Sequence, residues 1–200
     1  MRSYLQFHWW KYLLVILLPV IVWCSVFDAA AKPAPNEQVN VLLIGESFDT
    51  AAMEEAIATA LPSLTEQALR RFSVSTMVIG DTGYASLLTA RCFDYDILIF
   101  EESSIPENLG QDVFVRLTDP LLAQFPGLSP YTETIPEGDE LVYGLWIPDN
   151  ARFSGFYTGS ARCCLFVSPY SVNFDTLNET GTAGQDGALK CAQYLLECEP

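Results

Sequence analysis

Apolar residues are concentrated first in one uninterrupted stretch near the N-terminus. Residues 12–27 (YLLVILLPVIVWCSVF) carry no charge. Arg2 and Lys11 precede them, and Asp28 follows. Extended to Ala31, the stretch would be about 30 Å long as a helix, which is enough to cross a bilayer. The basic flank predicts a cytoplasmic N-terminus, so everything after residue 31 is expected outside the cytoplasm, as a single-pass protein of the cell membrane.

Two fates of this stretch stay open. The residues Ala29–Ala31 fit an A-x-A cleavage site, and cleavage after Ala31 would release a secreted protein. However, the stretch is long for a signal peptide, and the bulky Trp23 and Phe27 lie close to the cut, which favours a retained anchor. The predicted divisions are a signal peptide or signal anchor over residues 1–31, a linker over residues 32–38 and an extracellular domain over residues 39–200.

Short apolar runs then alternate with helical patterns. Runs that are apolar on both faces predict buried strands at Val39–Ile44, Val74–Ile79 and Asp96–Phe100. After the first run, Asp49 or Thr50 would cap a helix with apolar residues at helical spacing from Met53 to Leu64. A shorter helix over Tyr84–Ala90 would precede the third run. Buried strands separated by helices argue for an α/β fold with a doubly wound, mostly parallel sheet.

The pattern loosens in the second half of the chain. Residues 113–122 end in a proline-rich stretch. Leu141–Ile147 and Cys163–Val167 predict two further strands, and residues 186–198 predict an amphipathic helix. The whole domain is long enough to bury one core.

Polar residues directly follow the first three predicted strands, and a parallel sheet would gather them at one edge. Ligands bind at this edge in open α/β sheets, although serine and aspartate also cap helices there. Trp146 would stack on a sugar face or pack in the core, and carboxylates would accept hydrogen bonds from ligand hydroxyls. The predicted ligand-binding residues are Glu46, Ser47, Asp81, Thr82, Glu102, Ser103 and Trp146.

The part after the apolar stretch is strongly acidic. The chain has a net charge of −15, and from Pro33 onward it has 24 acidic residues and 7 basic ones. This charge repels nucleic-acid phosphates and anionic lipid headgroups, so nucleic acid is excluded as a partner. The expected partners are a small-molecule solute or a membrane protein, besides the membrane itself through residues 12–31.

Side chains for common catalytic and metal chemistry are lacking. His8, inside the N-terminal stretch, is the only histidine, so no Ser-His triad, Cys-His pair or histidine-based metal site is available. Five of the six cysteines lie beyond the N-terminal stretch, so at least one is free or pairs between chains. Most are expected to be buried as small apolar residues. We therefore expect no metal, no cofactor and no enzymatic activity.

Several short motifs follow one another in an order shared with one family of exported proteins. The first three are a "D-I-hydrophobic" strand at Asp94–Ile99, a "pL-x-D/T-p-L" segment at Val115–Leu122 and a "YG-hydrophobic-P" strand at Val142–Pro148. The last two are a strand before a Ser/Asn stretch at Leu165–Asn173 and an "A-L-x-x-x-x-Y-L" helix at Ala188–Leu196. In this order the chain resembles the extracellular solute-binding proteins of ABC transporters, which have the type II periplasmic-binding-protein fold.

The resemblance implies a solute-binding domain that takes a carbohydrate or peptide and is accessory to ABC-type uptake. Family members have two lobes that close on the ligand and are about twice this length, so the chain would correspond to a single lobe. A second hypothesis is a non-catalytic surface protein whose degenerate binding lobe contacts another protein. The odd number of cysteines and the missing lobe favour that alternative.

Overall fold

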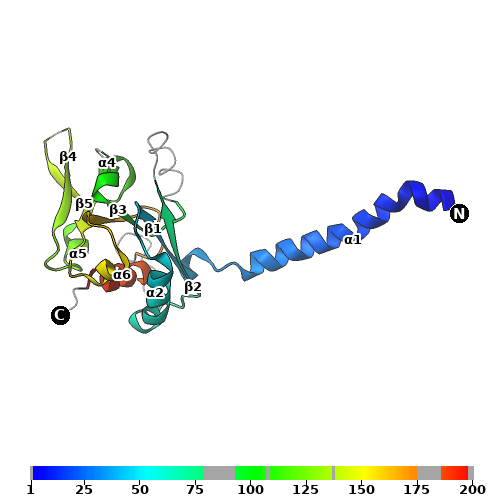
Figure 1. Ribbon diagram of the computed structural model, residues 1–200, viewed down its shortest axis with the longest axis horizontal. Coiled ribbons are helices and arrows are strands. Elements are labelled where there is room, and N and C mark those ends of the chain that lie inside the picture. The colour runs from blue at the N-terminus through cyan, green and yellow to red at the C-terminus, as the bar shows by residue number, and fades with distance from the viewer. Residues whose placement is uncertain (1, 79–92, 107–108, 137, 175–185, 198–200) are drawn as a thin grey trace. The chain divides into compact units, whose positions relative to one another are not determined.

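The computed structural model describes residues 2–78, 93–106, 109–136, 138–174 and 186–197 (Figure 1). The chain divides into two compact units, residues 1–34 and residues 35–200. The first unit is the helix α1 (Arg2–Ala31). Its segment Trp9–Phe27 is apolar and long enough to cross a membrane, and none of it is buried by the protein. A signal sequence has the same properties, so both predicted fates are compatible with this helix.

One six-stranded sheet forms the second unit, in the order β2-β1-β3-β6-β5-β4. Strand β1 pairs in parallel with β2 and β3, whereas the pairs β3–β6, β6–β5 and β5–β4 are antiparallel. The predicted α/β fold is confirmed, but the prediction of a mostly parallel sheet is wrong for its second half. The strands are β1 (Gln38–Ile44), β2 (Arg71–Met77), β3 (Ile97–Glu101), β4 (Pro130–Thr134), β5 (Glu140–Trp146) and β6 (Cys163–Val167).

Short connections explain the antiparallel half. Only residues 135–139 join β4 to β5, which is enough for a hairpin, whereas a parallel pair needs a crossover of a dozen or more residues. The sequence did not predict β4, because its one buried side chain is Glu133 rather than an apolar residue. Glu133 accepts hydrogen bonds from the backbone N–H of Gly110 at 2.7 Å and from the Tyr131 hydroxyl at 3.1 Å. An edge strand of this kind has no hydrophobic periodicity to detect.

The two long helices of this unit lie where the sequence predicted them. Helix α2 (Thr50–Leu64) is capped by Asp49, whose Oδ1 accepts a hydrogen bond from the N–H of Ala52 at 3.0 Å. Pro62 lies in its last turn without splitting it, and helix α6 (Gly187–Leu196) begins directly after Asp186. The predicted helix over residues 84–90 lies outside the described residues. Shorter helical elements are η1 (Pro35–Glu37), η2 (Glu102–Ser104), α4 (Leu109–Val113), α5 (Asp119–Leu122) and η3 (Arg152–Phe156).

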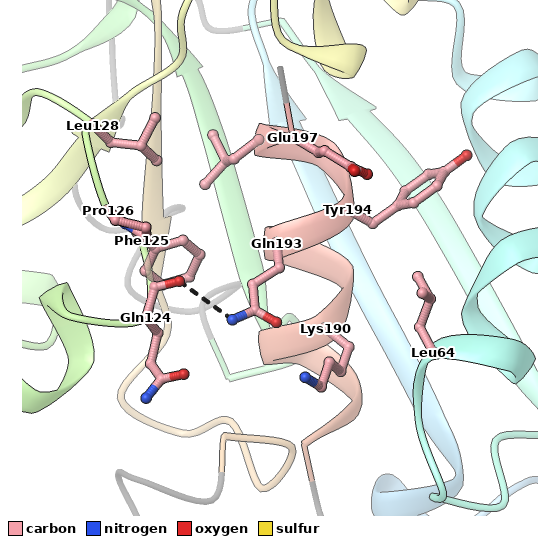
Figure 2. A pocket seen from close by; sticks show the side chains of 10 residues that line it. Leu64, Gln124, Phe125, Pro126, Leu128, Lys190, Gln193, Tyr194 and Glu197 are labelled. Carbon is pink, nitrogen blue, oxygen red and sulfur yellow. Dashed lines mark hydrogen bonds between the residues drawn. The ribbon is translucent and has the colours of Figure 1, made fainter. Parts of the chain in front are cut away.

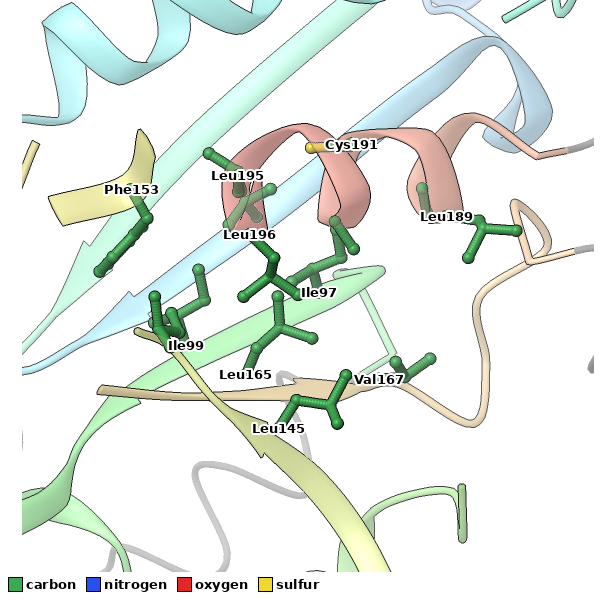
Figure 3. Close-up of a cluster of buried hydrophobic side chains, with 14 of the residues drawn as sticks. Ile97, Ile99, Leu145, Phe153, Leu165, Val167, Leu189, Cys191, Leu195 and Leu196 are labelled. Atoms are coloured by element: carbon green, nitrogen blue, oxygen red, sulfur yellow. The ribbon is translucent and has the colours of Figure 1, made fainter. Parts of the chain in front are cut away.

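The sheet separates two hydrophobic clusters. The larger one lies under α2 and α6, and in Figure 3 Leu195, Leu196 and Cys191 of α6 lie over Ile97 and Leu165 of the sheet. Alternate residues of the same strands face the other cluster, which is rich in aromatic rings. Burial of both faces of β1, β3 and β6 explains why these strands read as continuous apolar runs.

Candidate functional site

The carboxyl ends of β1 and β3 meet where the connections of the sheet diverge. The chain passes from β1 to β2 on one side and returns to β3 on the other side of β1. Open α/β sheets bind ligands at such a switch point. The ends of β1, β3 and β5 and the beginning of β6 lie at this edge. We call it the carboxyl edge; it comprises Gly45, Glu46, Ser47, Glu101, Glu102, Ser103, Trp146, Tyr157 and Arg162.

Glu101 joins the ends of the two parallel strands. Its Oε2 accepts a hydrogen bond from the backbone N–H of Glu46 at 3.1 Å, and its Oε1 accepts one from the Tyr157 hydroxyl. A Cβ at Gly45 would overlap the Glu101 carboxylate, so only glycine fits beside it. Burial and the hydrogen bond to Glu101 raise the pKa of Tyr157, so its hydroxyl stays protonated as a donor. Glu101 is thus satisfied by the protein itself.

The loop after β1 is held in an unusual backbone conformation. Ser47 has φ of 70°, a left-handed value that non-glycine residues rarely adopt. Its carbonyl accepts hydrogen bonds from the Thr158 N–H at 2.9 Å and from the Thr158 hydroxyl at 3.1 Å. The N–H of Asp49 donates to the Phe156 carbonyl at 2.8 Å. The end of η3 and the segment after it therefore fix this loop, and the side chains of Glu46 and Ser47 stay exposed.

Trp146 and Arg162 form a stacked pair beside η2. The Arg162 guanidinium lies 4.0 Å from the centre of the Trp146 ring, and the Arg162 carbonyl accepts a hydrogen bond from the N–H of Glu102 at 2.8 Å. Trp146 is half-buried and packs against the aromatic cluster, with Tyr131 at 5.6 Å between ring centres. Its ring therefore serves partly as core and partly as a support for a cation.

The predicted ligand-binding residues are partly brought together. Glu46 and Ser47 follow β1, Glu102 and Ser103 begin η2, and Trp146 ends β5, all at the carboxyl edge. Asp81 and Thr82 lie outside the described residues. That these side chains bind a ligand stays a prediction.

A second polar cluster lies at the opposite edge of the sheet, around the buried Asp96. Its Oδ1 accepts hydrogen bonds from the Ser171 hydroxyl at 2.5 Å and from Asn173 Nδ2 at 3.0 Å, and its Oδ2 accepts one from the N–H of Asn40 at 2.9 Å. Burial raises the pKa of Asp96, while these three hydrogen bonds act in the other direction. We call this end of the sheet the amino edge; it comprises Pro35, Asn36, Glu37, Gln38, Asn40, Phe93, Asp94, Tyr95, Asp96, Tyr170, Ser171, Val172 and Asn173.

Two cavities lie away from the carboxyl edge. The larger one, of about 510 Å³, lies between α6, the end of α2 and the segment after α5 (Figure 2). Gln193 and Tyr194 line it from α6, and Gln193 Nε2 donates to the Gln124 carbonyl at 3.3 Å. The smaller one, of about 270 Å³, lies at the amino edge and includes Asp94 and Tyr170 in its wall.

The cysteines of the domain that the structure describes are buried thiols. Burial raises the pKa of Cys163 to about 12, and it also raises the pKa of Cys164 and Cys191. A thiol that stays protonated at neutral pH is a poor nucleophile and a poor metal ligand. The prediction that most cysteines serve as small apolar residues is confirmed for these three. Among the described residues, no three His, Cys, Asp or Glu side chains are placed to hold a metal ion.

Sequence reasoning missed Arg162 and Tyr157. Arg162 directly precedes the predicted strand Cys163–Val167. Basic residues are few in this acidic domain, so an arginine next to a buried strand could have indicated a binding residue. Tyr157 gave no signal, since its contact with Glu101 joins residues 56 positions apart. Comparison with protein-family models, curated proteins and solved structures finds no match to this chain.

Proposed function

We propose that the domain is a membrane-tethered, extracytoplasmic solute-binding module, which takes a small polar solute such as a carbohydrate or peptide at the carboxyl edge. The observation that supports this most directly is the switch point between β1 and β3, with Glu46, Ser47 and Glu102 exposed around it. The apolar helix α1 would hold the module at the membrane, where it would act as an accessory to ABC-type uptake.

The Arg162–Trp146 pair supports a polar ligand. The stack fixes the guanidinium over the Trp146 ring, and Arg162 has no ion pair with a carboxylate among the described residues. Its N–H groups would donate to ligand oxygens while the exposed carboxylates accept hydrogen bonds from ligand hydroxyls. Both kinds of hydrogen bond are needed to recognise a sugar or a peptide backbone.

The rigidity of the edge also supports binding. Glu101 and the loop after β1 are held by hydrogen bonds within the protein. A site fixed before the ligand arrives loses less conformational entropy on binding. One lobe suffices for a shallow, modest-affinity site, and the tether would raise the local concentration near a membrane partner.

A thermal-shift panel of sugars and short peptides on the purified full chain in detergent tests this function. Binding at a concentration of 100 Kd should stabilise the protein by about 2.7 kcal/mol. Arg162→Gln should reduce the shift, whereas Arg116→Gln, on an exposed segment away from this edge, should leave it unchanged. No shift with any compound would overturn the proposal.

The alternative function is contact with another protein through the same edge. It is favoured by the placement of the two cavities described above, since neither includes a predicted ligand-binding residue in its wall. A rigid edge outside these two cavities suits contact with a protein surface better than enclosure of a solute. A photocrosslinking residue in place of Ser103 should then trap a specific membrane protein in intact cells. If the solute-binding function is correct instead, the same variant should form no crosslink to a protein.

A further inference from the structure

An exposed aromatic pair lies at the amino edge of the sheet. Phe93 and Tyr170 are 54% and 52% exposed, and their ring centres are 4.0 Å apart. Val172, beside them in the wall of the same cavity, is 36% exposed. Pro35, the first residue of the domain, lines that cavity as well. The apolar patch of Phe93, Tyr170 and Val172 therefore lies next to the point where the chain enters the domain.

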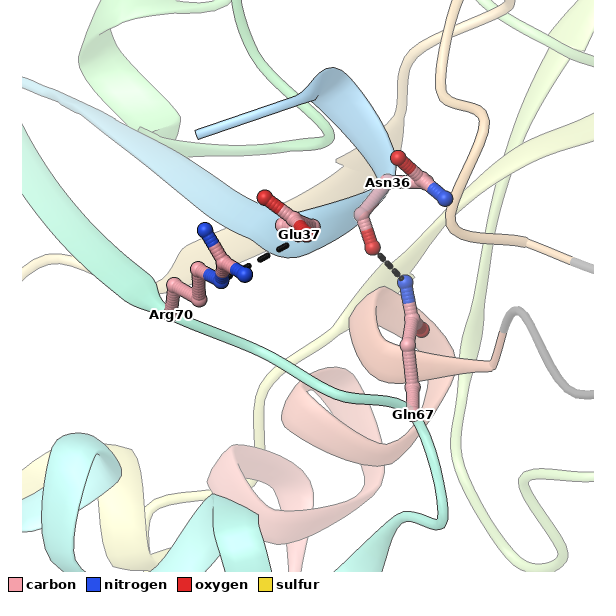
Figure 4. A network of polar contacts seen from close by, with 4 residues as sticks. All are labelled: Asn36, Glu37, Gln67 and Arg70. Atoms are coloured by element: carbon pink, nitrogen blue, oxygen red, sulfur yellow. Dashed lines mark hydrogen bonds and ion pairs between the residues drawn. The ribbon is translucent and has the colours of Figure 1, made fainter. Parts of the chain in front are cut away.

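Hydrogen bonds fix this entry point to the domain. Gln67 Nε2 donates to the carbonyl of Asn36, and the Arg70 side chain lies 3.5 Å from the Glu37 carboxylate (Figure 4). Asn173 Nδ2 donates to the carbonyls of Pro35 at 3.2 Å and of Gln38 at 2.8 Å. The stretch predicted as a linker over residues 32–38 thus becomes part of the domain from Pro35 onward.

Only Lys32, Pro33 and Ala34 then connect α1 to the domain. Whatever the orientation of the helix, three residues allow at most about 14 Å between the Cα atoms of Ala31 and Pro35. If α1 spans the bilayer through Trp9–Phe27, its last four residues add about 6 Å beyond the apolar layer. Pro35 therefore lies within about 20 Å of the apolar layer, which allows the amino edge to reach the headgroups.

We propose that the amino edge rests in the headgroup layer of the membrane, with the patch of Phe93, Tyr170 and Val172 inserted among zwitterionic phospholipids. This inference rests on the membrane tether of the proposed function. Tyr170, with an apolar ring and a polar hydroxyl, is of the type that favours this layer, while Phe93 and Val172 add apolar surface beside it. The exposed Arg71, paired in register with Gln38, and Lys32 would contact lipid phosphates.

Zwitterionic lipid fits the charge of the domain. The excess of 24 acidic over 7 basic residues after residue 32 opposes an anionic surface, and Asp94 is exposed next to the aromatic pair. Phosphatidylcholine has no net charge, so apolar insertion meets no net repulsion. This orientation would leave the carboxyl edge, at the other end of the strands, facing away from the bilayer and open to solute.

Photocrosslinking to lipid tests the proposal on the full chain in phosphatidylcholine vesicles. Benzoylphenylalanine replaces Phe93 or Tyr170 in two separate variants. Val78 provides a matched control, because it is 64% exposed and directly follows β2 at the opposite edge of the sheet. Mass spectrometry should find roughly tenfold more lipid adduct from positions 93 and 170 than from position 78.

Flotation of the same vesicles distinguishes the two ways to fail. In one outcome the chain floats with the vesicles at high pH while positions 93 and 170 give no more lipid adduct than position 78. In that case the proposed contact between the amino edge and lipid is wrong, but the membrane anchor of the proposed function is retained. If the chain does not float, the tether of the proposed function and this inference both fail. Unchanged thermal unfolding of each variant ensures that a low yield does not reflect misfolding, and either aromatic position alone suffices for the comparison.

Discussion

The two edges of the sheet fix a carboxylate in contrasting ways. At the amino edge, Asp96 is 6% exposed and accepts three hydrogen bonds, from Asn40, Ser171 and Asn173. At the carboxyl edge, Glu101 is half-buried and accepts two, from Glu46 and Tyr157. The more deeply buried carboxylate has more donors, as the cost of removing a charge from water requires. The first arrangement joins the chain entry to the core, and the second shapes a surface.

The largest expected effect is at Asp96. Asp96→Ala would leave the buried Ser171 hydroxyl and the half-buried N–H of Asn40 without their acceptor, whereas Asn173 Nδ2 keeps the carbonyls of Pro35 and Gln38. Together with the cavity left by the side chain, this should lower the free energy of unfolding by about 3 kcal/mol. Chemical denaturation followed by circular dichroism measures the change. Asp94→Ala, at an exposed neighbouring position, is the control and should change it by less than about 0.5 kcal/mol. Equal losses of unfolding free energy in the two variants would show that the buried Asp96 contributes no more to stability than the exposed Asp94.

A smaller loss is expected where Gly45 contacts Glu101. Gly45 has φ of 139°, and a Cβ there would overlap the Glu101 carboxylate, so Gly45→Ala should cost about 2 kcal/mol of stability. Gly127 also has a positive φ, of 81°, but a Cβ there would meet nothing within 4 Å. Gly127→Ala should therefore cost about 1 kcal/mol from backbone strain alone. If both variants lose the same stability, the contact with Glu101 contributes nothing.

Removal of one donor to Glu101 should have a milder effect. Tyr157→Phe deletes the hydroxyl that donates to Oε1 but keeps the ring, which packs against Phe48 with 5.1 Å between ring centres. Water can replace the donor at this half-buried site, so the loss should be about 1 kcal/mol in urea denaturation. Tyr170→Phe alters a hydroxyl on an exposed ring and serves as the control. A loss for Tyr157→Phe above that for Gly45→Ala would place the hydroxyl, rather than the backbone, at the centre of this edge.

Much of the sheet could be predicted because its central strands are buried on both faces. The short apolar runs at Val39–Ile44 and Cys163–Val167 are typical of strands buried on both faces. Their direction could not be predicted, since a buried strand has the same pattern whether its neighbour is parallel or antiparallel. The edge strand β4 was missed because its buried residue is the hydrogen-bonded Glu133.

The carboxyl edge was predictable in position but not in detail. Strand ends mark where Glu46 and Glu102 lie, because parallel strands end together. The partners that fix the edge come from a distant segment, as Tyr157 and Thr158 do, and no local pattern predicts such contacts. The polar cluster of the amino edge was not predicted: Asp96 was placed at the start of a buried strand, but its partners Ser171 and Asn173 lie more than 70 residues away, and no local pattern indicates such contacts.

The smallest effect is expected in the pH dependence of Asp96, since three hydrogen bonds offset part of its burial cost. Burial raises its pKa in the folded protein above the ordinary value of 3.8. The folded protein therefore holds this proton more tightly than the unfolded chain, so the contribution of Asp96 to stability is fully present below about pH 3.8 and declines as pH rises through the folded pKa. Asp96→Asn has no such proton. The free energy of unfolding of the wild type relative to Asp96→Asn should rise as the pH falls from 7 towards 4. A relative stability that falls in acid would mean that the hydrogen bonds from Asn40, Ser171 and Asn173 outweigh the effect of burial on Asp96.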